Sequence, residues 1–271
     1  MKIVNDGLDF SVVKGIVYKD NGAVRFTSSR GFVQDLDDLP FPSRELFDNE
    51  AYQNYYSKRL GYTSTPVITS RGCPFSCDFC SRPVFGTSFR MRSPSNIVDE
   101  VESVVSFGYD RVWFADDCFT LDREHLISVC EEMVRRGVDV GWECLSRVDT
   151  MDRLGAGEMR RAGCVRVFFG IESGNDDVLG VMNKRITVAQ ARRAVYAAKA
   201  AGLQVGAFLL LVILVRVMGL FWIRCVLLLG FRWIICRLLC LILFLELRCM
   251  SVCGVMVALR WRIGRSLRIG V

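Results

Sequence analysis

Three cysteines lie close together in one short segment of the sequence. Cys73, Cys77 and Cys80 have a CxxxCxxC spacing directly after a β-rich run, Pro66 to Thr69. Three thiolates this close can converge on one inorganic centre. A structural zinc ion is usually enclosed by four ligands, and the only histidine, His125, is on a later predicted helix. A 4Fe-4S cluster held by three cysteines leaves one iron open to a small molecule. The spacing therefore favours a catalytic cluster, with zinc or a chance spacing as the alternatives.

The elements around the cysteines alternate between short β-branched runs and longer amphipathic ones. Strands are predicted at 66–69, 111–115, 138–144, 165–171 and from 205 to 211. Helices are predicted at 93–108, 122–136, 151–162 and 187–202, the first with Ser93-Pro94 at its start and the last with a capping-box pattern at Thr187. Successive βα units predict a parallel sheet wrapped by helices, with chemistry at the carboxyl ends of the strands.

The N-terminal region has a different pattern. Val12 to Tyr18 and Ala23 to Thr27 are β-rich runs on either side of Asn21-Gly22, which predicts a tight hairpin. The polar segment from Asp35 to Ser43 contains two prolines that stop regular structure, so it is expected to be a linker.

The last 60 residues differ in composition from the rest. Residues 212–271 contain nine Arg and one Glu, but no Lys, Asp, Asn, Gln, His, Thr, Tyr or Pro. Residues 1–211 carry 26 basic and 28 acidic side chains, so the formal net charge of +6 comes from the tail and indicates no nucleic-acid partner. The first ten residues have no apolar run typical of a secretory signal, which predicts a cytoplasmic protein.

The cysteine segment resembles the cluster loop of the radical S-adenosylmethionine (SAM) superfamily, including an aromatic residue, Phe79, before the third cysteine. In that family the open iron chelates the methionine part of SAM, and reductive cleavage yields a 5′-deoxyadenosyl radical that takes hydrogen from the substrate. The resemblance implies an α/β fold, a partial (βα)6 barrel of parallel strands, incomplete here after the fifth strand. It also implies an enzyme with a 4Fe-4S cluster and S-adenosyl-L-methionine as cofactors, a small-molecule or lipid-like substrate, and an electron donor such as a flavodoxin or ferredoxin.

Further site residues follow from the same resemblance. Asp116 and Asp117 stand where the family places acids for the methionine ammonium, after the second strand. Arg147, after the third strand, is available to pair with a carboxylate. Glu172 and Ser173, after the fourth strand, are placed for ribose hydroxyls or the methionine amine.

Each of these residues has a simpler interpretation as well. Asp116 and Asp117 fit the N-terminus of a helix, Arg147 fits an ion pair with Asp149 or another acid, and Glu172 fits a purely solvated role. The remaining cysteines before the tail sit in apolar patterns and are interpreted as small core residues: Cys118, Cys130, Cys144 and Cys164.

The N-terminal segment indicates which subgroup of the radical SAM superfamily the chain resembles. Residues 15–22 followed by 35–42 resemble the join between a cobalamin-binding domain and the barrel in cobalamin-dependent members. We therefore expect 1–64 to be a remnant and linker following a missing cobalamin-binding domain, and 65–211 to be the radical SAM core. The family's DxHxxG cobalamin signature is absent, since His125 lies in Arg123-Glu-His-Leu126. Cobalamin is expected only together with the missing upstream domain.

Three interpretations of residues 212–271 compete. A membrane span needs about 20 apolar residues, but five arginines interrupt the run: Arg216, Arg224, Arg232, Arg237 and Arg248. An Arg-rich surface helix is the second interpretation. In the neighbouring reading frame, 212–224 permits Gly-Tyr-Pro-Gly-Glu and 241–251 permits a Pro-Gly-Thr segment, both resembling family segments. We therefore expect an out-of-frame tail. The alternative for the whole chain is a non-catalytic iron-sulfur or zinc-binding protein with a membrane-associated tail.

Overall fold

A parallel β-sheet forms the main body of the protein in the computed structural model, which describes residues 9–80 and 85–210. The sheet has five strands in the order β3-β6-β7-β8-β9, and all its neighbouring strands run parallel. The strands are Ser64–Val67 (β3), Arg111–Phe114 (β6), Gly141–Ser146 (β7), Cys164–Glu172 (β8) and Gln204–Leu209 (β9). The expectation of an out-of-frame tail at 212–271 lies outside the described residues.

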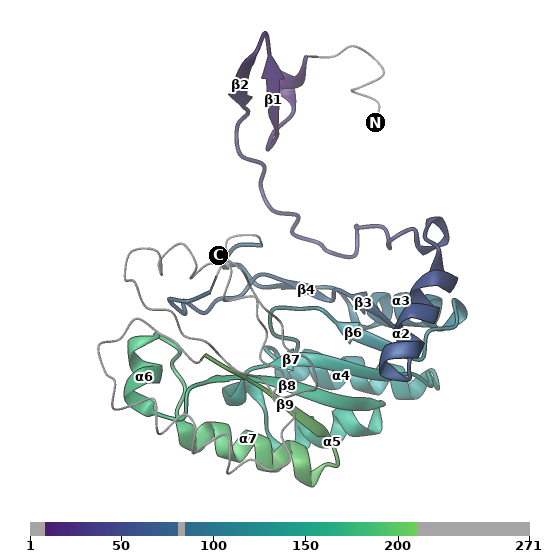
Figure 1. Cartoon of the computed structure of the whole chain (residues 1–271), viewed down its shortest axis with the longest axis vertical. Helices are drawn as coiled ribbons and strands as arrows, with labels where there is room; N and C mark the ends of the chain where they lie inside the picture. Colours follow the sequence, from purple (N-terminus) through teal and green to yellow (C-terminus); the bar gives the residue numbers. More distant parts are fainter. Residues whose placement is uncertain (1–8, 81–84, 211–271) are drawn as a thin grey trace, which may run out of the picture.

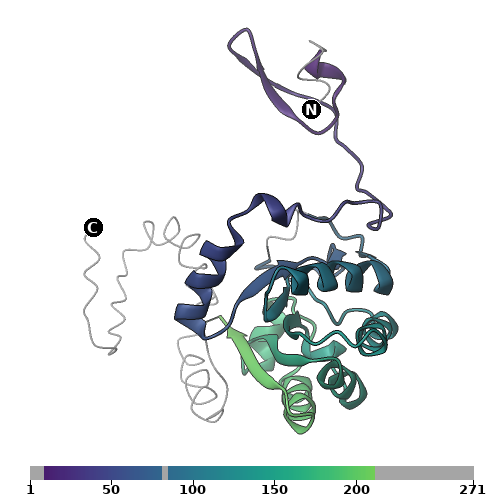
Figure 2. The ribbon, with the colours of Figure 1, turned by 90° about the vertical axis from the view of Figure 1, so that its right-hand side faces the viewer.

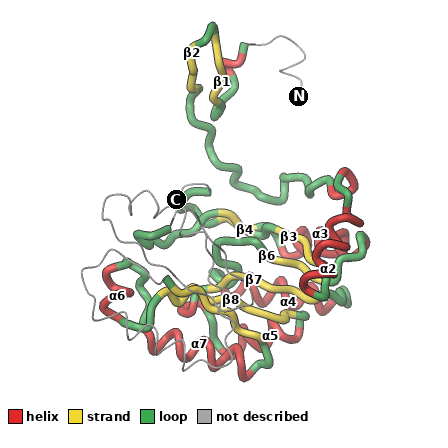
Figure 3. Tube along the Cα trace, viewed as in Figure 1, coloured by secondary structure: helices red, strands yellow, loops and turns green. Residues whose placement is uncertain are grey.

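Helices follow the strands and cover one face of the sheet, as Figures 1 and 3 show. They are Pro94–Ser106 (α3), Arg123–Arg135 (α4), Arg153–Arg161 (α5) and Val188–Ala200 (α7), while the short helix Asp176–Val181 (α6) lies past the carboxyl end of β8. Viewed from the side, the helices form an arc outside the sheet (Figure 2). The core lies between these layers, and its largest fully buried side chains include Trp142, Phe114 and Phe169. The predicted α/β fold is confirmed. The described strands form an open sheet, so they make up part of a barrel and not a closed one.

Helix starts follow the capping residues read from the sequence. The Ser93 side chain accepts a hydrogen bond from the backbone N–H of Asn96, and Pro94 occupies the first helical position of α3. Thr187 and Gln190 form the predicted capping box of α7. These local signals fix where each helix begins, and therefore where each preceding loop ends.

Several elements differ from the sequence expectation, among them the short helix α6, which was not predicted. Strand β7 begins at Gly141 rather than residue 138, because Val138 still donates its backbone N–H to Met133 at the end of α4. The helix α2, Asn49–Leu60, was not predicted. It buries none of its residues, so its sequence has no apolar stripe to indicate it, although Asp48 caps its start.

The N-terminal hairpin stands away from the sheet at the end of an extended connection (Figure 1). It follows a short 3-10 helix, η1 (Phe10–Val12), and consists of β1 (Val17–Asp20) and β2 (Ala23–Phe26). The predicted turn is confirmed, with positive φ angles at Asn21 (47°) and Gly22 (86°). The interpretation of 1–64 as a remnant and linker stays a prediction.

A buried charge cluster anchors the connection to the sheet. Glu100 of α3 is 2% exposed and forms ion pairs with both Arg44 and Arg92. Arg44, in the 3-10 helix η2 (Arg44–Leu46), also donates to the carbonyl of Pro66 in β3 over 2.9 Å. Residues before the core are thereby fixed to the strand that leads into the cysteines.

Among the described residues, no helix is long and apolar enough to cross a bilayer.

Candidate functional site

The cysteines occupy a loop whose two ends are clipped together. β4 (Ser70–Arg71) and β5 (Arg90–Met91) pair antiparallel at the base of the loop. Gly72 has φ of +90°, and a side chain there would collide with the carbonyl of Ser88, so only glycine permits this turn. The backbone N–H of Cys73 then donates to the carbonyl of Gly86 over 3.2 Å.

The three thiols differ in exposure. Cys73 is half-buried, Cys77 is buried and Cys80 is exposed, and none of them forms a disulfide. In residues 9–80 and 85–210, no three His, Cys, Asp or Glu side chains are grouped tightly enough to hold a metal ion. The donor set nevertheless has the chemistry that an iron-sulfur cluster needs, because one loop carries three thiol ligands. Their role as ligands stays a prediction.

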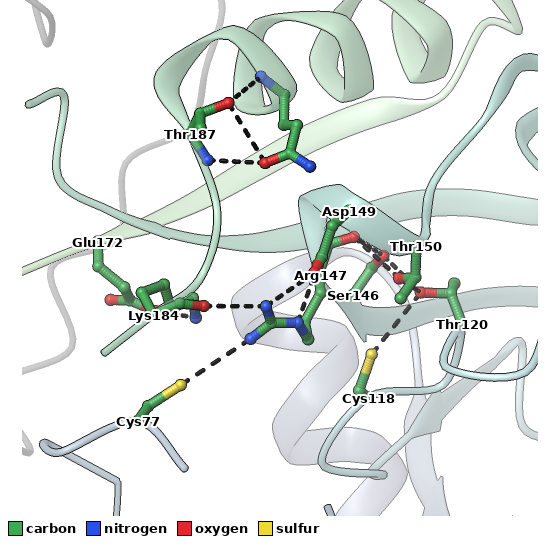
Figure 4. A network of polar contacts seen from close by, with 11 residues as sticks. Cys77, Cys118, Thr120, Ser146, Arg147, Asp149, Thr150, Glu172, Lys184 and Thr187 are labelled. Carbon is green, nitrogen blue, oxygen red and sulfur yellow. Dashed lines mark hydrogen bonds and ion pairs between the residues drawn. The ribbon is translucent and has the colours of Figure 1, made fainter. Parts of the chain in front are cut away.

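Arg147, directly after β7, connects the cysteine loop to the sheet (Figure 4). Its Nη1 lies 3.9 Å from Sγ of Cys77, and its Nη2 donates to the carbonyl of Lys184 over 3.0 Å. Its guanidinium pairs with Asp149 through two 2.9 Å contacts and lies 3.5 Å from the ring centroid of Phe75. Burial disfavours the charged form, but Asp149 outweighs it and raises the pKa of Arg147.

The simpler interpretation of Arg147, an ion pair with Asp149, is therefore present in the structure. It does not remove Arg147 from the site, because the same guanidinium also contacts the cysteine loop. A buried, permanently charged cation therefore lies against the segment that carries the proposed ligands.

Glu172 ends β8 in a strained conformation beside a lysine. Its φ is +63°, and its Oε1 lies 3.1 Å from Nζ of Lys184, with both side chains buried. Burial raises the pKa of Glu172, and the charge of Lys184 opposes that shift. A side chain at Gly170 would crowd both charged groups. Lys184 Nζ also lies 5.4 Å from the ring centroid of Phe79, and Ser173 is buried beside Glu172. The solvated role considered for Glu172 is thus not what the structure shows.

A second connection to the cysteine loop comes from the segment that follows α6. The amide of Asn183 donates to the carbonyl of Ser76 over 2.7 Å, and the backbone N–H of Asp78 donates to Met182 over 3.1 Å. Asn183 has a positive φ of 51°, which asparagine tolerates better than most residues. The segment 182–184 also resembles the family's entry to the helix after the fourth strand. Its contact with the cysteine loop had no signal in the sequence, because the two segments are 107 residues apart.

The two acids after β6 have separate environments. Asp116 is buried and accepts hydrogen bonds from the backbone N–H groups of Thr69 and Ser70, over 2.7 and 3.0 Å, and from the Thr69 hydroxyl. Asp117 is exposed. Neither caps α4, whose N-cap is Asp122, so the helix-terminus interpretation is wrong. Asp116 fixes the start of the cysteine segment, which leaves Asp117 as the acid of the pair that faces solvent.

Replacing Asp116 with asparagine is expected to change how stability depends on pH. Burial raises the pKa of Asp116 to about 6, so the native carboxyl binds its proton more tightly than the unfolded one does. The resulting stabilisation is complete below about pH 4 and is lost as the pH rises through 6, which amounts to about 3 kcal/mol. Denaturant unfolding between pH 4 and 7 checks this expectation. The Asp116→Asn protein should lack the decline, and parallel pH profiles for the two proteins would contradict it.

The other described cysteines belong to the core. Cys118, Cys130, Cys144 and Cys164 are all at most 2% exposed, which confirms their interpretation as small core residues. Burial raises the pKa of Cys118, Cys130 and Cys144, so these thiols are poor nucleophiles and poor ligands.

Comparisons with known proteins agree with this geometry. Residues 67–217 match the Radical SAM superfamily, and the chain belongs to that family of enzymes. It is 35% identical over 210 residues to an uncharacterized methyltransferase of Pyrococcus horikoshii, a match covering 76% of this chain and 45% of the relative. It is 32% identical over 188 residues to the anaerobic magnesium-protoporphyrin IX monomethyl ester cyclase of Cereibacter sphaeroides, covering 68% of this chain and 30% of the relative. The chain thus spans less than half the length of these curated relatives.

Two solved structures share the fold. The cobalamin-dependent SAM radical enzyme OxsB superposes with a TM-score of 0.73 at 20% identity, covering 93% of this chain and 37% of that one. The radical SAM methyltransferase TsrM from Kitasatospora setae gives a TM-score of 0.64 at 18% identity, covering 77% of this chain and 43% of that one. Membership of the family implies a 4Fe-4S cluster and SAM.

Proposed function

We propose that the site cleaves SAM reductively at a 4Fe-4S cluster ligated by Cys73, Cys77 and Cys80. One observation carries the proposal: Arg147, directly after β7, and Asn183, in the segment after α6 whose Lys184 pairs with Glu172 at the end of β8, both contact the cysteine loop. Residues from separate βα units meet at the edge of the sheet where parallel α/β enzymes place their chemistry.

The cluster, when bound, supplies the electron that breaks a sulfur–carbon bond of SAM and so starts radical chemistry. The chain's own residues are proposed to bind and orient. Glu172 accepts hydrogen bonds from the polar groups of SAM, and the hydroxyl of Ser173 supports it. Asp117 pairs with the methionine ammonium, and Phe79 and Arg147 border the cofactor beside the cysteines. Burial raises the pKa of Glu172, and the ion pair with Lys184 opposes that rise and so favours the carboxylate form.

The finer part of the proposal is methyl transfer to a small-molecule or lipid-like substrate in a longer protein. Its support is that curated relatives are named methyltransferases and that OxsB and TsrM were solved with cobalamin. The described residues do not fit cobalamin through a DxHxxG motif, because His125 lies in the first turn of α4 and its Nε2 is buried without a hydrogen-bond partner. No step through cobalamin is derived for this chain.

Substitution of Asp117 with asparagine and of Glu172 with glutamine is expected to weaken SAM binding about tenfold or more each, because each removes one charge-assisted contact. The chain is reconstituted with iron and sulfide without oxygen, and the change in its absorption and electron paramagnetic resonance spectra is followed as SAM is added. Iron content should stay near that of the unsubstituted chain.

Asp177→Asn serves as the matched control, because Asp177 is an exposed acid on α6. Iron lost in step with SAM binding would contradict the roles given to Asp117 and Glu172. A chain that holds iron but shows no spectral response to SAM would instead favour a non-catalytic iron-sulfur protein.

A further inference from the structure

The linker before the core touches the returning arm of the cysteine loop through Arg90. Arg90 is buried and donates from Nη1 to the carbonyl of Val33 over 2.8 Å, and its guanidinium lies 4.7 Å from the ring centroid of Phe32. The same side chain donates to the carbonyls of Phe85 over 2.8 Å and Ser88 over 3.2 Å. One arginine therefore joins the linker to residues 85–88.

Phe32 is also connected to Cys73, the first cysteine of the loop, through one intervening residue, Gly86. Its ring lies directly on Gly86, where a Cβ would stand 2.7 Å from the ring atom Cε2. The carbonyl of Gly86 accepts the hydrogen bond of the Cys73 backbone N–H over 3.2 Å. The contact thus runs from the Phe32 ring to the Gly86 backbone and on to the Cys73 backbone.

We infer that Phe32 is a positioning residue for Cys73, so that a linker segment outside the βα core sets the placement of the first proposed cluster ligand. The inference rests on the proposed function, because it takes Cys73 to be a ligand. Phe32 is 48% exposed, so its ring contributes little to the core. Its ring contacts Arg90 and Gly86 on the returning arm of the cysteine loop, so its expected effect is local.

The first test needs no cluster. Hydrogen exchange at the Cys73 amide is compared in the full apo chain with and without Phe32→Ala. Loss of the ring frees residues 85–88, so the Gly86–Cys73 hydrogen bond should open more often and exchange should accelerate about two- to fivefold. Phe32→Tyr, which keeps the ring, should restore the original rate. Phe47→Ala, at another exposed aromatic residue before α2, is the matched control and should leave Cys73 unchanged.

The second test follows the reconstituted cluster. Iron release to a chelator should be about two- to fivefold faster in Phe32→Ala than in the unsubstituted chain, at an unchanged melting temperature. Unchanged exchange at Cys73, or equal iron release, overturns the inference. An exchange increase spread equally over β8 would also overturn it, because that result indicates general destabilisation. Failure of the unsubstituted chain to hold a cluster overturns the proposed function instead. The exchange comparison would then still test whether Phe32 positions the Cys73 backbone.

Discussion

Replacing Cys77 with alanine is expected to eliminate cluster-dependent cleavage of SAM. Cys77 is the buried member of the three and the one whose sulfur faces the Arg147 guanidinium. Without its thiolate, a cluster would keep only two protein ligands, and the Arg147 guanidinium would lose its contact with the Cys77 sulfur. Release of 5′-deoxyadenosine from SAM by the dithionite-reduced, reconstituted chain measures the effect. Cys73→Ala and Cys80→Ala should give the same loss.

A matched control comes from the core thiols. Cys130→Ala removes a buried cysteine from α4, so iron content and cleavage should remain near those of the unsubstituted chain after allowance for stability. Cleavage retained in a protein that lacks all three loop cysteines would show that the cluster is held elsewhere.

Replacing Glu100 with glutamine is expected to destabilise the fold by about 3–5 kcal/mol, because Arg44 and Arg92 would be left buried without a counter-charge. Arg92 also donates to the carbonyl of Ile68 over 2.9 Å, so the loss reaches the segment between β3 and β4 that leads into the cysteines. Urea unfolding measures the change in the free energy of unfolding.

The matched control for Glu100 lies on the same helix. Glu102 is exposed and pairs with Arg136 over 3.3 Å, so Glu102→Gln should change stability by less than about 1 kcal/mol. Equal effects of the two substitutions would contradict the stabilising role given to the buried ion pairs of Glu100 with Arg44 and Arg92.

Local signals account for the part of the fold that the sequence predicts. Ser93 and Thr187 specify helix starts through caps formed within three residues, and Asn21-Gly22 specifies the hairpin through its positive φ angles. Such interactions depend only on neighbours in the sequence. The helix α2 was missed because its residues bury no common face, so no periodic pattern marks it.

The candidate site was predictable in its residues and only partly in its contacts. The spacing of the cysteines and the family resemblance led to Arg147 and Glu172, and the structure places both beside the loop or its partner segment. The separation of Asp116 from Asp117 depends on hydrogen bonds to Thr69 and Ser70, which the sequence does not encode locally. Long-range partners of this kind require the fold itself.

The strand order has a consequence for biosynthesis. In the main sheet, the strands lie side by side in the order in which the ribosome makes them, so each new strand can pair with the one completed before it. The cysteine loop emerges before β6, yet its anchors, Arg147 and Asn183, are made 67 or more residues after Cys80. During synthesis the cysteine loop is therefore made before the residues that hold it. A nascent chain that ends before residue 183 lacks at least one of its two contacts, those with Arg147 and Asn183. If the three cysteines ligate a cluster as proposed, we expect iron and sulfide to be inserted after β8 and the segment that carries Asn183 have been made.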